Sequence, residues 1–221
     1  MSEPLTVPRA ILARRAVRKF DPNRPLPEDL LVGILGLATH APSSYNLQPW
    51  RFLVVRSERN RQRLRACAYN QPKITEAPVV VIVLGYTRGY ETDLAPMLDR
   101  RVALGGMRPE VAAEAKGRAL ASLGKHRDLP SWALRSAMLA AGAMMIAAQG
   151  LGVDSAPMEG FDAGKIKQEF GVPDDHVVCC LVCLGYALER DPFPGRFGLE
   201  HVCYEEHFGQ PWTLGQPPPA G

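Results

Sequence analysis

The residues that most clearly suggest chemistry are basic ones near the N-terminus. Residues 14–19, Arg-Arg-Ala-Val-Arg-Lys, hold four cations within six positions, and we call them the basic segment. Clustered guanidinium groups bind phosphate through paired hydrogen bonds, so the basic segment could form an anion site. A charge run is more often a solvated face, and these residues alone leave both interpretations open.

A second candidate is residues 156–162, Ala-Pro-Met-Glu-Gly-Phe-Asp, which we call the strap. Pro157 lacks a backbone donor, and Gly160 permits an unusual turn or the close approach of a ligand. A strap delivered by a buried helix could fix backbone N–H groups against a flat cofactor. The alternative is an ordinary loop that follows a core helix.

A third candidate is the polar loop, residues 40–49, which reads His-Ala-Pro-Ser-Ser-Tyr-Asn-Leu-Gln-Pro. It is dense in hydroxyl and amide groups between two prolines. It is either a plain connector or a loop whose polar groups face a ligand, since loops on a rigid scaffold often carry binding residues.

No arrangement for metal or thiol chemistry accompanies these stretches. Cys180 and Cys183 match C-x-x-C on paper, but the surrounding VVCCLVCLGY predicts a buried strand, where residues three apart point to opposite faces. They could not share a metal or form a redox pair, so buried structural thiols are favoured. The five histidines show no zinc-type spacing, and we therefore predict no metal site.

The element that would deliver the strap is a helix over residues 133–148. No polar side chain lies between Ser136 and Gln149, so the helix has no polar face. Such a helix is buried in a core or spans a membrane, and the apolar run 137–148 is too short for a bilayer, which needs about 20 residues. We predict burial within protein and an end at the glycines that follow.

The remaining pattern mixes strands and helices. Apolar runs predict three strands, at residues 50–55, 79–84 and 177–184. A first helix begins after Thr6, with Pro8 in its first turn, and further helices are predicted at residues 27–39, 58–68, 110–123 and 163–170. Residues 86–109 show no clear period. We find no repeat and no linker, so we predict one α+β domain over residues 1–221.

Composition bounds the class of protein. The chain has 221 residues, of which 46% are hydrophobic and 22% charged, as in soluble globular proteins. A net charge of +3 is too weak to argue for nucleic acid. The N-terminal MSEPLTVPRA lacks the apolar core of a signal peptide, and five cysteines argue against a disulfide framework. We expect a cytoplasmic protein that binds neither membrane nor nucleic acid.

Four separated stretches together resemble one family. RRAVRKF, APSSYNLQPWRF, PMEGFD and the tail segment around Arg196 are similar, in order and spacing, to the nitroreductase family of FMN-dependent oxidoreductases. The resemblance covers nearly the whole chain except the region from Tyr86 to about Pro130. It implies an α+β fold with a mainly antiparallel sheet flanked by helices, and an intertwined homodimer with two FMN sites at its interface.

The resemblance also implies which residues hold FMN. The positions that match phosphate and ribityl contacts are Arg14, Arg15, Ala16 and, from the tail, Arg196. The positions that match contacts to the polar edge of the ring are Arg18, Asn70 and Lys73. The strap positions over the ring are Pro157, Met158, Glu159 and Gly160. The positions by which the partner subunit touches the same flavin are Pro42, Ser43, Ser44 and Asn46.

Two positions depart from the family pattern. Ala16 stands where many relatives have Ser, so one hydroxyl donor is missing, and Pro194 stands where some have Lys, so one cation near the phosphate is missing. The three arginines Arg14, Arg15 and Arg196 still meet the need of a nearly dianionic phosphate. Hydride transfer asks the protein for orientation and electrostatics, so no catalytic side chain is named.

The implied activity is a ping-pong reaction in which NADH or NADPH reduces FMN, and FMN then reduces a nitroaromatic, a quinone or a similar small acceptor. Another flavin reaction, such as reductive dehalogenation or dehydrogenation of a small metabolite, is an alternative, because residues 86–130 carry no readable signature of the substrate. A further alternative is a non-catalytic protein that carries FMN. A nucleic-acid binder is less favoured, since the basic runs lack interleaved aromatic residues.

Overall fold

The computed structural model describes residues 4–189 and 192–212. Residues 4–189 belong to one compact unit, and residues 192–212 belong to a second. The two units are therefore described separately, and the single domain over residues 1–221 stays a prediction.

The first unit is built on a sheet of four strands. They are β1 (Trp50–Val55), β2 (Val79–Tyr86), β3 (Asp154–Met158) and β4 (His176–Gly185). The strand order is β1-β2-β4-β3, and every neighbouring pair is antiparallel. The two central strands, β2 and β4, are buried along most of their length, which agrees with their unbroken apolar runs. The predicted mainly antiparallel α+β fold is confirmed.

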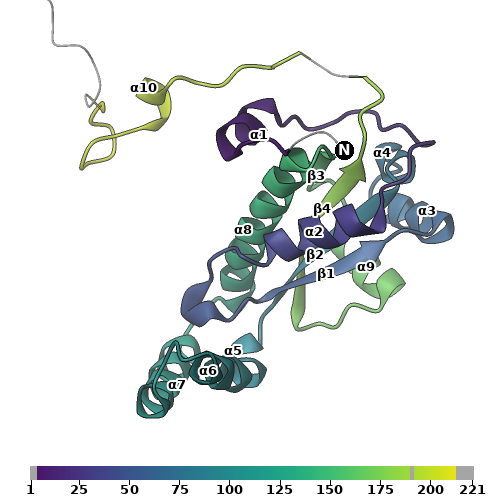
Figure 1. The fold of residues 1–221 in the computed structure, drawn as a ribbon. Helices are drawn as coiled ribbons and strands as arrows, with labels where there is room; N and C mark the ends of the chain where they lie inside the picture. The colour runs from purple at the N-terminus through teal and green to yellow at the C-terminus, as the bar shows by residue number, and fades with distance from the viewer. Residues whose placement is uncertain (1–3, 190–191, 213–221) are drawn as a thin grey trace, which may run out of the picture. The chain divides into compact units, whose positions relative to one another are not determined.

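Helices cover both faces of this sheet (Figure 1). Along β2, Val81 packs into a core with α2 (Glu28–Ala38) and α8 (Leu129–Gly150), and the next residue, Ile82, packs into a second core. Adjacent strand residues point to opposite faces, so the two cores lie on opposite sides of the sheet. The second core is completed by three helices, α3 (Glu58–Cys67), α4 (Lys73–Glu76) and α9 (Ala163–Phe170).

Helix α8 is longer than its apolar run. It begins after Asp128, whose carboxylate accepts a hydrogen bond from the backbone N–H of Ser131 at 3.0 Å. The whole helix has 22 residues, so by length and composition alone it could cross a membrane, although its unbroken apolar run is shorter. It instead packs against β2, β4 and α2, as a core helix does. Its cover is incomplete, because the Leu139 side chain is 53% exposed within the described part of the chain.

A helical excursion, residues 89–123, leaves the sheet after β2. It consists of α5 (Gly89–Thr92), α6 (Leu94–Ala103) and α7 (Pro109–Leu123), which gather at one end of the unit in Figure 1. Its small core joins Leu94 and Leu98 to Trp132 at the start of α8. Helix α6 was not predicted. The interpretation that residues 86–109 have no clear period was wrong here, since the two buried side chains of α6, Leu94 and Leu98, stand one helical turn apart.

The N-terminal helix α1 (Val7–Ala13) lies against α8, and the backbone N–H of Leu5 donates to the carbonyl of Gly150 at 3.0 Å. Thr6 precedes α1 as predicted, but its hydroxyl makes no capping bond. In the second unit, α10 (Leu199–Val202) is followed by a bridge between Tyr204 and Pro211.

Candidate functional site

The strap is partly a strand, which the sequence did not predict. Its first three residues, 156–158, belong to β3, the edge strand beside β4, and Pro157 pairs in register with Val182. An edge strand tolerates proline because one side of its backbone faces no neighbouring strand. Beyond β3 the chain emerges, and Glu159 and Gly160 are exposed. No hydrogen bond joins their backbone N–H groups to any residue that the structure describes.

The basic segment runs along the outer edge of β3. Ala16 forms a parallel bridge with Ser155, and the backbone N–H of Val17 donates to the Ser155 carbonyl at 3.2 Å. Val17 and Phe20 are buried in the core on the α3 side and anchor the segment. Arg14 and Arg15 are half-buried there, and an open cavity of about 150 Å³ is lined by Ala13, Arg15, Ala16, Val17, Asp154, Ala187 and Glu189.

A turn after α3, at residues 69–73, lies against the strap. Tyr69 and Asn70 have positive φ angles of 52° and 57°, which non-glycine residues adopt mainly where the surroundings fix them. The next residue, Gln71, donates from Nε2 to the Gly160 carbonyl at 2.8 Å. The backbone N–H of Asp162 donates to the Cys67 carbonyl at 2.8 Å. The strap and this turn are therefore joined by hydrogen bonds on both sides of Phe161.

Helix α4 links the turn to the basic segment. It begins at Lys73, which is half-buried, and its Glu76 carboxylate accepts a hydrogen bond from the backbone N–H of Phe20 at 3.2 Å. Three stretches far apart in the sequence thus meet at the β3 edge. They contain most of the predicted site residues, namely Arg14, Arg15, Ala16, Arg18, Asn70, Lys73, Pro157, Met158, Glu159 and Gly160.

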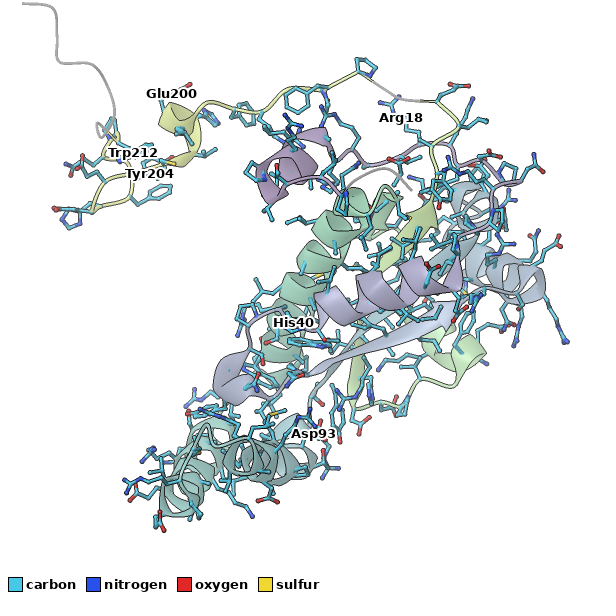
Figure 2. The ribbon with its side chains drawn as sticks, viewed as in Figure 1. Arg18, His40, Asp93, Glu200, Tyr204 and Trp212 are labelled. Carbon is cyan, nitrogen blue, oxygen red and sulfur yellow. The ribbon has the colours of Figure 1, made fainter. Side chains whose placement is uncertain are left out.

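The polar loop lies elsewhere. It precedes β1, at the other edge of the sheet, and Ala41 packs in the core on the α8 side. Four strands spaced by about 4.8 Å put the two edges roughly 14 Å apart. Figure 2 shows His40 of the loop well apart from Arg18 of the basic segment. Four predicted site residues therefore do not lie at the β3 edge within a single chain, namely Pro42, Ser43, Ser44 and Asn46.

The polar loop has an unusual backbone of its own. Tyr45, Asn46 and Gln48 all have positive φ angles, of 56°, 57° and 48°. The Ser43 hydroxyl accepts a hydrogen bond from the backbone N–H of Gln48 at 2.9 Å and closes the loop. A cavity of about 310 Å³ separates the loop from α8, lined by Pro42, Ser43, Ser44, Trp132, Arg135, Ser136 and Leu139.

Arg196 lies in the second unit, where its Nη1 donates to the Gly195 carbonyl at 2.6 Å and its guanidinium carbon is 5.3 Å from the centre of the Phe193 ring. Its contact with phosphate stays a prediction.

The three cysteines of β4 are buried, as expected for structural residues. Burial raises the pKa of Cys179, Cys180 and Cys183 to about 12, so these thiols stay protonated. Cys180 packs on the α8 side of the sheet and Cys183 on the other, as predicted for residues three apart in a strand. The Cys183 thiol donates at 3.6 Å to the sulfur of Met158, a residue of the strap. Within residues 4–189 and 192–212, no cluster of three metal-ligating side chains is found.

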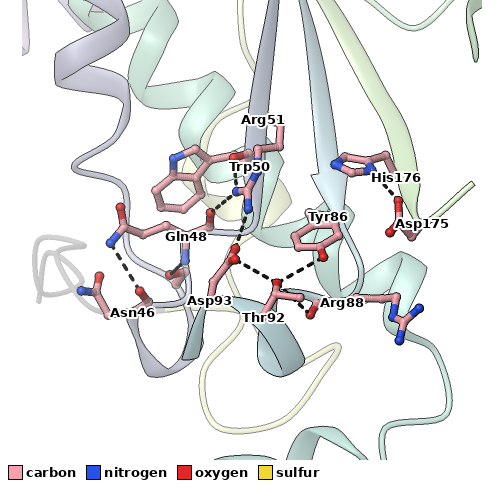
Figure 3. Close-up of polar contacts among 11 residues, drawn as sticks. Asn46, Gln48, Trp50, Arg51, Tyr86, Arg88, Thr92, Asp93, Asp175 and His176 are labelled. Carbon is pink, nitrogen blue, oxygen red and sulfur yellow. Dashed lines mark hydrogen bonds and ion pairs between the residues drawn. The ribbon is translucent and has the colours of Figure 1, made fainter. Parts of the chain in front are cut away.

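Two features of the site were missed from the sequence. Gln71 supports the strap, and its place in a turn between two helices gave no signal beyond the neighbouring Tyr-Asn pair. A polar network around Arg51, Tyr86 and Asp93 joins the end of the sheet to the helical excursion (Figure 3). Its members come from three separated segments, so no spacing in the sequence connects them.

Comparisons with known proteins agree on one family. A sequence model of a protein family, described as "Nitroreductase family", matches residues 11–186. The chain is 35% identical over 195 residues to an NADH dehydrogenase of Thermus thermophilus, covering 87% of this chain and 92% of that one. It is 30% identical over 174 residues to an oxygen-insensitive NAD(P)H nitroreductase of Enterobacter cloacae, covering 74% and 80%.

Solved structures give the same answer. A protein from Exiguobacterium sibiricum, assigned as a nitroreductase and solved in complex with FMN, superposes with a TM-score of 0.87 and 26% identity, covering 93% of this chain and 99% of that one. An NAD(P)H:FMN oxidoreductase assigned in Staphylococcus epidermidis superposes with a TM-score of 0.88 at 23% identity, covering 93% and 98%, which supports the fold.

Proposed function

Because the chain belongs to the nitroreductase family, it is an FMN-dependent oxidoreductase supplied by NADH or NADPH, and we propose that it passes electrons by a ping-pong reaction to a nitroaromatic, a quinone or a similar small acceptor. The relative from Enterobacter cloacae is named for nitroreductase activity, which supports this class of acceptor. The proposal includes a cytoplasmic location, where both electron donors are abundant.

The observation that carries the proposal is the convergence of the basic segment, the turn at residues 69–73 and the strap at the β3 edge. The donors gathered there suit FMN. Half-buried guanidinium groups suit a phosphate, and exposed backbone N–H groups suit the polar atoms of a flat ring.

Each residue then has a task in binding or orientation. Arg14 and Arg15 would hold the phosphate, and Arg18 and Lys73 would face the pyrimidine edge of the ring. There they would stabilise the negative charge that develops on reduction, which raises the reduction potential. The strap would orient the ring through backbone N–H groups. When bound, FMN supplies the ring that takes up hydride and passes the electrons on.

The site requires a second copy of the chain. The polar loop lies at the opposite edge of its own sheet, so we propose that Pro42, Ser43, Ser44 and Asn46 reach the flavin of the partner subunit. The partly exposed α8 supports this arrangement, since the apolar Leu134 and Leu139 side chains are 37% and 53% exposed within one chain. Arg196 joins the phosphate contacts in the same proposal.

Colour tests the proposal directly. The purified protein should be yellow, or should become so with one FMN per chain, and NADH or NADPH should bleach it under anaerobic conditions. Addition of a quinone or a nitroaromatic should restore the colour. A colourless protein that cannot be reconstituted with FMN would contradict the site, and a flavoprotein that bleaches but is not reoxidised by either acceptor would contradict the acceptor class.

A further inference from the structure

Arg51, the second residue of β1, joins three segments through one guanidinium group. Its Nη1 donates to the Trp50 carbonyl at 2.9 Å and to the Gln48 carbonyl at 3.2 Å. Its Nη2 forms an ion pair with Asp93 Oδ2 at 2.5 Å. Its guanidinium carbon lies 4.9 Å from the centre of the Tyr86 ring. Figure 3 shows these contacts converging from the polar loop, the sheet and the helical excursion.

The polar loop needs such a support. Gln48 has a positive φ, and strained backbone persists only where neighbouring groups fix it. Arg51 holds the carbonyl of Gln48, while the Ser43 hydroxyl holds its N–H. Further along, Asn46 donates from Nδ2 to the sulfur of Met97, a residue of α6, at 3.1 Å. The loop is therefore tied both to β1 and to the helical excursion.

Asp93 stands at the junction of α5 and α6. The Thr92 hydroxyl bonds to Asp93 Oδ1 at 2.9 Å and to the Tyr86 hydroxyl at 3.1 Å, so the junction is fixed to the ends of both β1 and β2. An open cavity of about 620 Å³ lies between the end of α2, β1 and α6, with Arg51 and Asp93 on its wall. Beside this cavity, Leu47 of the polar loop is buried in the small core with Leu94 and Leu98 of α6, so polar and apolar contacts together set the spacing.

We propose that Arg51 is a positioning residue that holds the polar loop and the helical excursion in one arrangement, and so sets the loop's contact with the partner's flavin. This inference rests on the proposed function, in which the loop reaches the partner's site. Lysine could keep the charge opposite Asp93, but a single ammonium group cannot reproduce the planar fork that serves two carbonyls and a carboxylate.

Two variants separate the two ends of the network. Arg51→Lys should speed amide hydrogen exchange about fivefold in residues 42–48 and also in residues 89–103, as expected for a half-exposed ion pair and its hydrogen bonds. Asp93→Asn neutralises the carboxylate and weakens only the link to α5 and α6. Exchange should therefore rise in residues 89–103 and rise less in residues 42–48, where Arg51 still holds the Gln48 carbonyl. Arg56→Lys is the matched control, since Arg56 forms an ion pair with Glu28 at 2.5 Å directly after the same strand.

The functional consequence has its own readout. FMN titration should show affinity weakened about fivefold in Arg51→Lys and unchanged in Asp93→Asn and in the control. At saturating FMN, kcat of Arg51→Lys should change little, because positioning rather than chemistry is altered. A uniform rise of exchange over the whole chain, or no rise in residues 42–48 of Arg51→Lys, would overturn the positioning role.

Unchanged FMN affinity in Arg51→Lys despite a loosened loop would overturn the link to the flavin. The exchange experiment runs on the protein without FMN, so it decides the positioning role even where FMN uptake fails. Failure of the wild-type chain to take up FMN would instead contradict the proposed function, and the two failures are therefore distinguishable.

Discussion

Addition of one methyl group at Gly160 separates contact with the flavin from the stability of the chain. A Cβ at this position would meet Gln71 Nε2 at 3.0 Å, and that atom now donates to the Gly160 carbonyl at 2.8 Å. Gln71 can swing away, at a cost of about 0.5–1.5 kcal/mol for the lost hydrogen bond. Gly160 is not among the residues with positive φ, so alanine also restricts the unfolded chain and returns about 0.4–1 kcal/mol.

The unfolding free energy of Gly160→Ala should therefore stay within about 1 kcal/mol of the wild type, measured by urea unfolding of the FMN-free protein. FMN affinity should fall much further. Overpacking of one methyl group against a close-packed partner costs about 1–3 kcal/mol, which corresponds to roughly fivefold to 150-fold in the dissociation constant. Gly160→Val should be worse still.

The double variant Gln71→Ala/Gly160→Ala identifies the cause. It removes the neighbour within the chain, so affinity should stay low if the ring itself is obstructed. Recovery of affinity in the double variant would show that displaced Gln71 was responsible, and would refute contact between the strap and the ring. Glu159→Gln is the control, since it keeps the backbone N–H and should bind FMN like the wild type.

Three further predictions concern the phosphate, the dimer and the thiols. Arg14→Ala should weaken FMN binding about 10-fold to 150-fold, the equivalent of 1.5–3 kcal/mol for a charge-assisted bond, whereas Arg59→Ala on the exposed side of α3 should not; equal titrations of both variants would count against the phosphate site. Refolded mixtures of Arg14→Ala and Asn46→Ala chains should regain tight FMN sites, because a mixed dimer holds one site without either change; verified mixed dimers that bind no better than the parents would rule out a loop acting across the interface. Burial raises the pKa values of the β4 thiols from 9.0 to about 12, so their contribution to the unfolding free energy is complete below pH 9 and is lost as pH rises toward 12. Urea unfolding should therefore give a lower unfolding free energy at pH 10.5 than at pH 8. A chain with alanine at Cys179, Cys180 and Cys183 should show a smaller difference between the two pH values.

Local patterns in the sequence predicted much of the fold. Strand β1 and helix α9 were predicted with the bounds that the structure has, because each is a clear apolar or amphipathic run between turn residues. Helix α8 begins four residues before the predicted Ala133, although Asp128 and Pro130 gave a usable start signal. Helix α6 was missed, since a helix that packs mainly on other helices of a small excursion needs few buried positions.

The site was predicted less completely, for reasons of tertiary structure. Pro157 suggested a loop, but the position of β3 at the sheet edge allows proline within a strand. The meeting of the basic segment with the turn at residues 69–73 depends on long-range contacts such as that between Phe20 and Glu76, which no spacing reveals. The family resemblance supplied these residues together, and the structure supplies the contacts that bring them to one edge.

The strap lies at the end of an edge strand, and this position makes the lifetime of the protein depend on the supply of FMN. Edge strands open more readily than central ones, and β3 is held by β4 on one side and by a single bridge to the basic segment on the other. If FMN binds there as proposed, it favours the closed edge by mass action, by about 2.7 kcal/mol at a concentration 100 times its dissociation constant. Chains made during flavin starvation would therefore expose this edge to proteases, and the amount of enzyme in the cell would follow the amount of flavin.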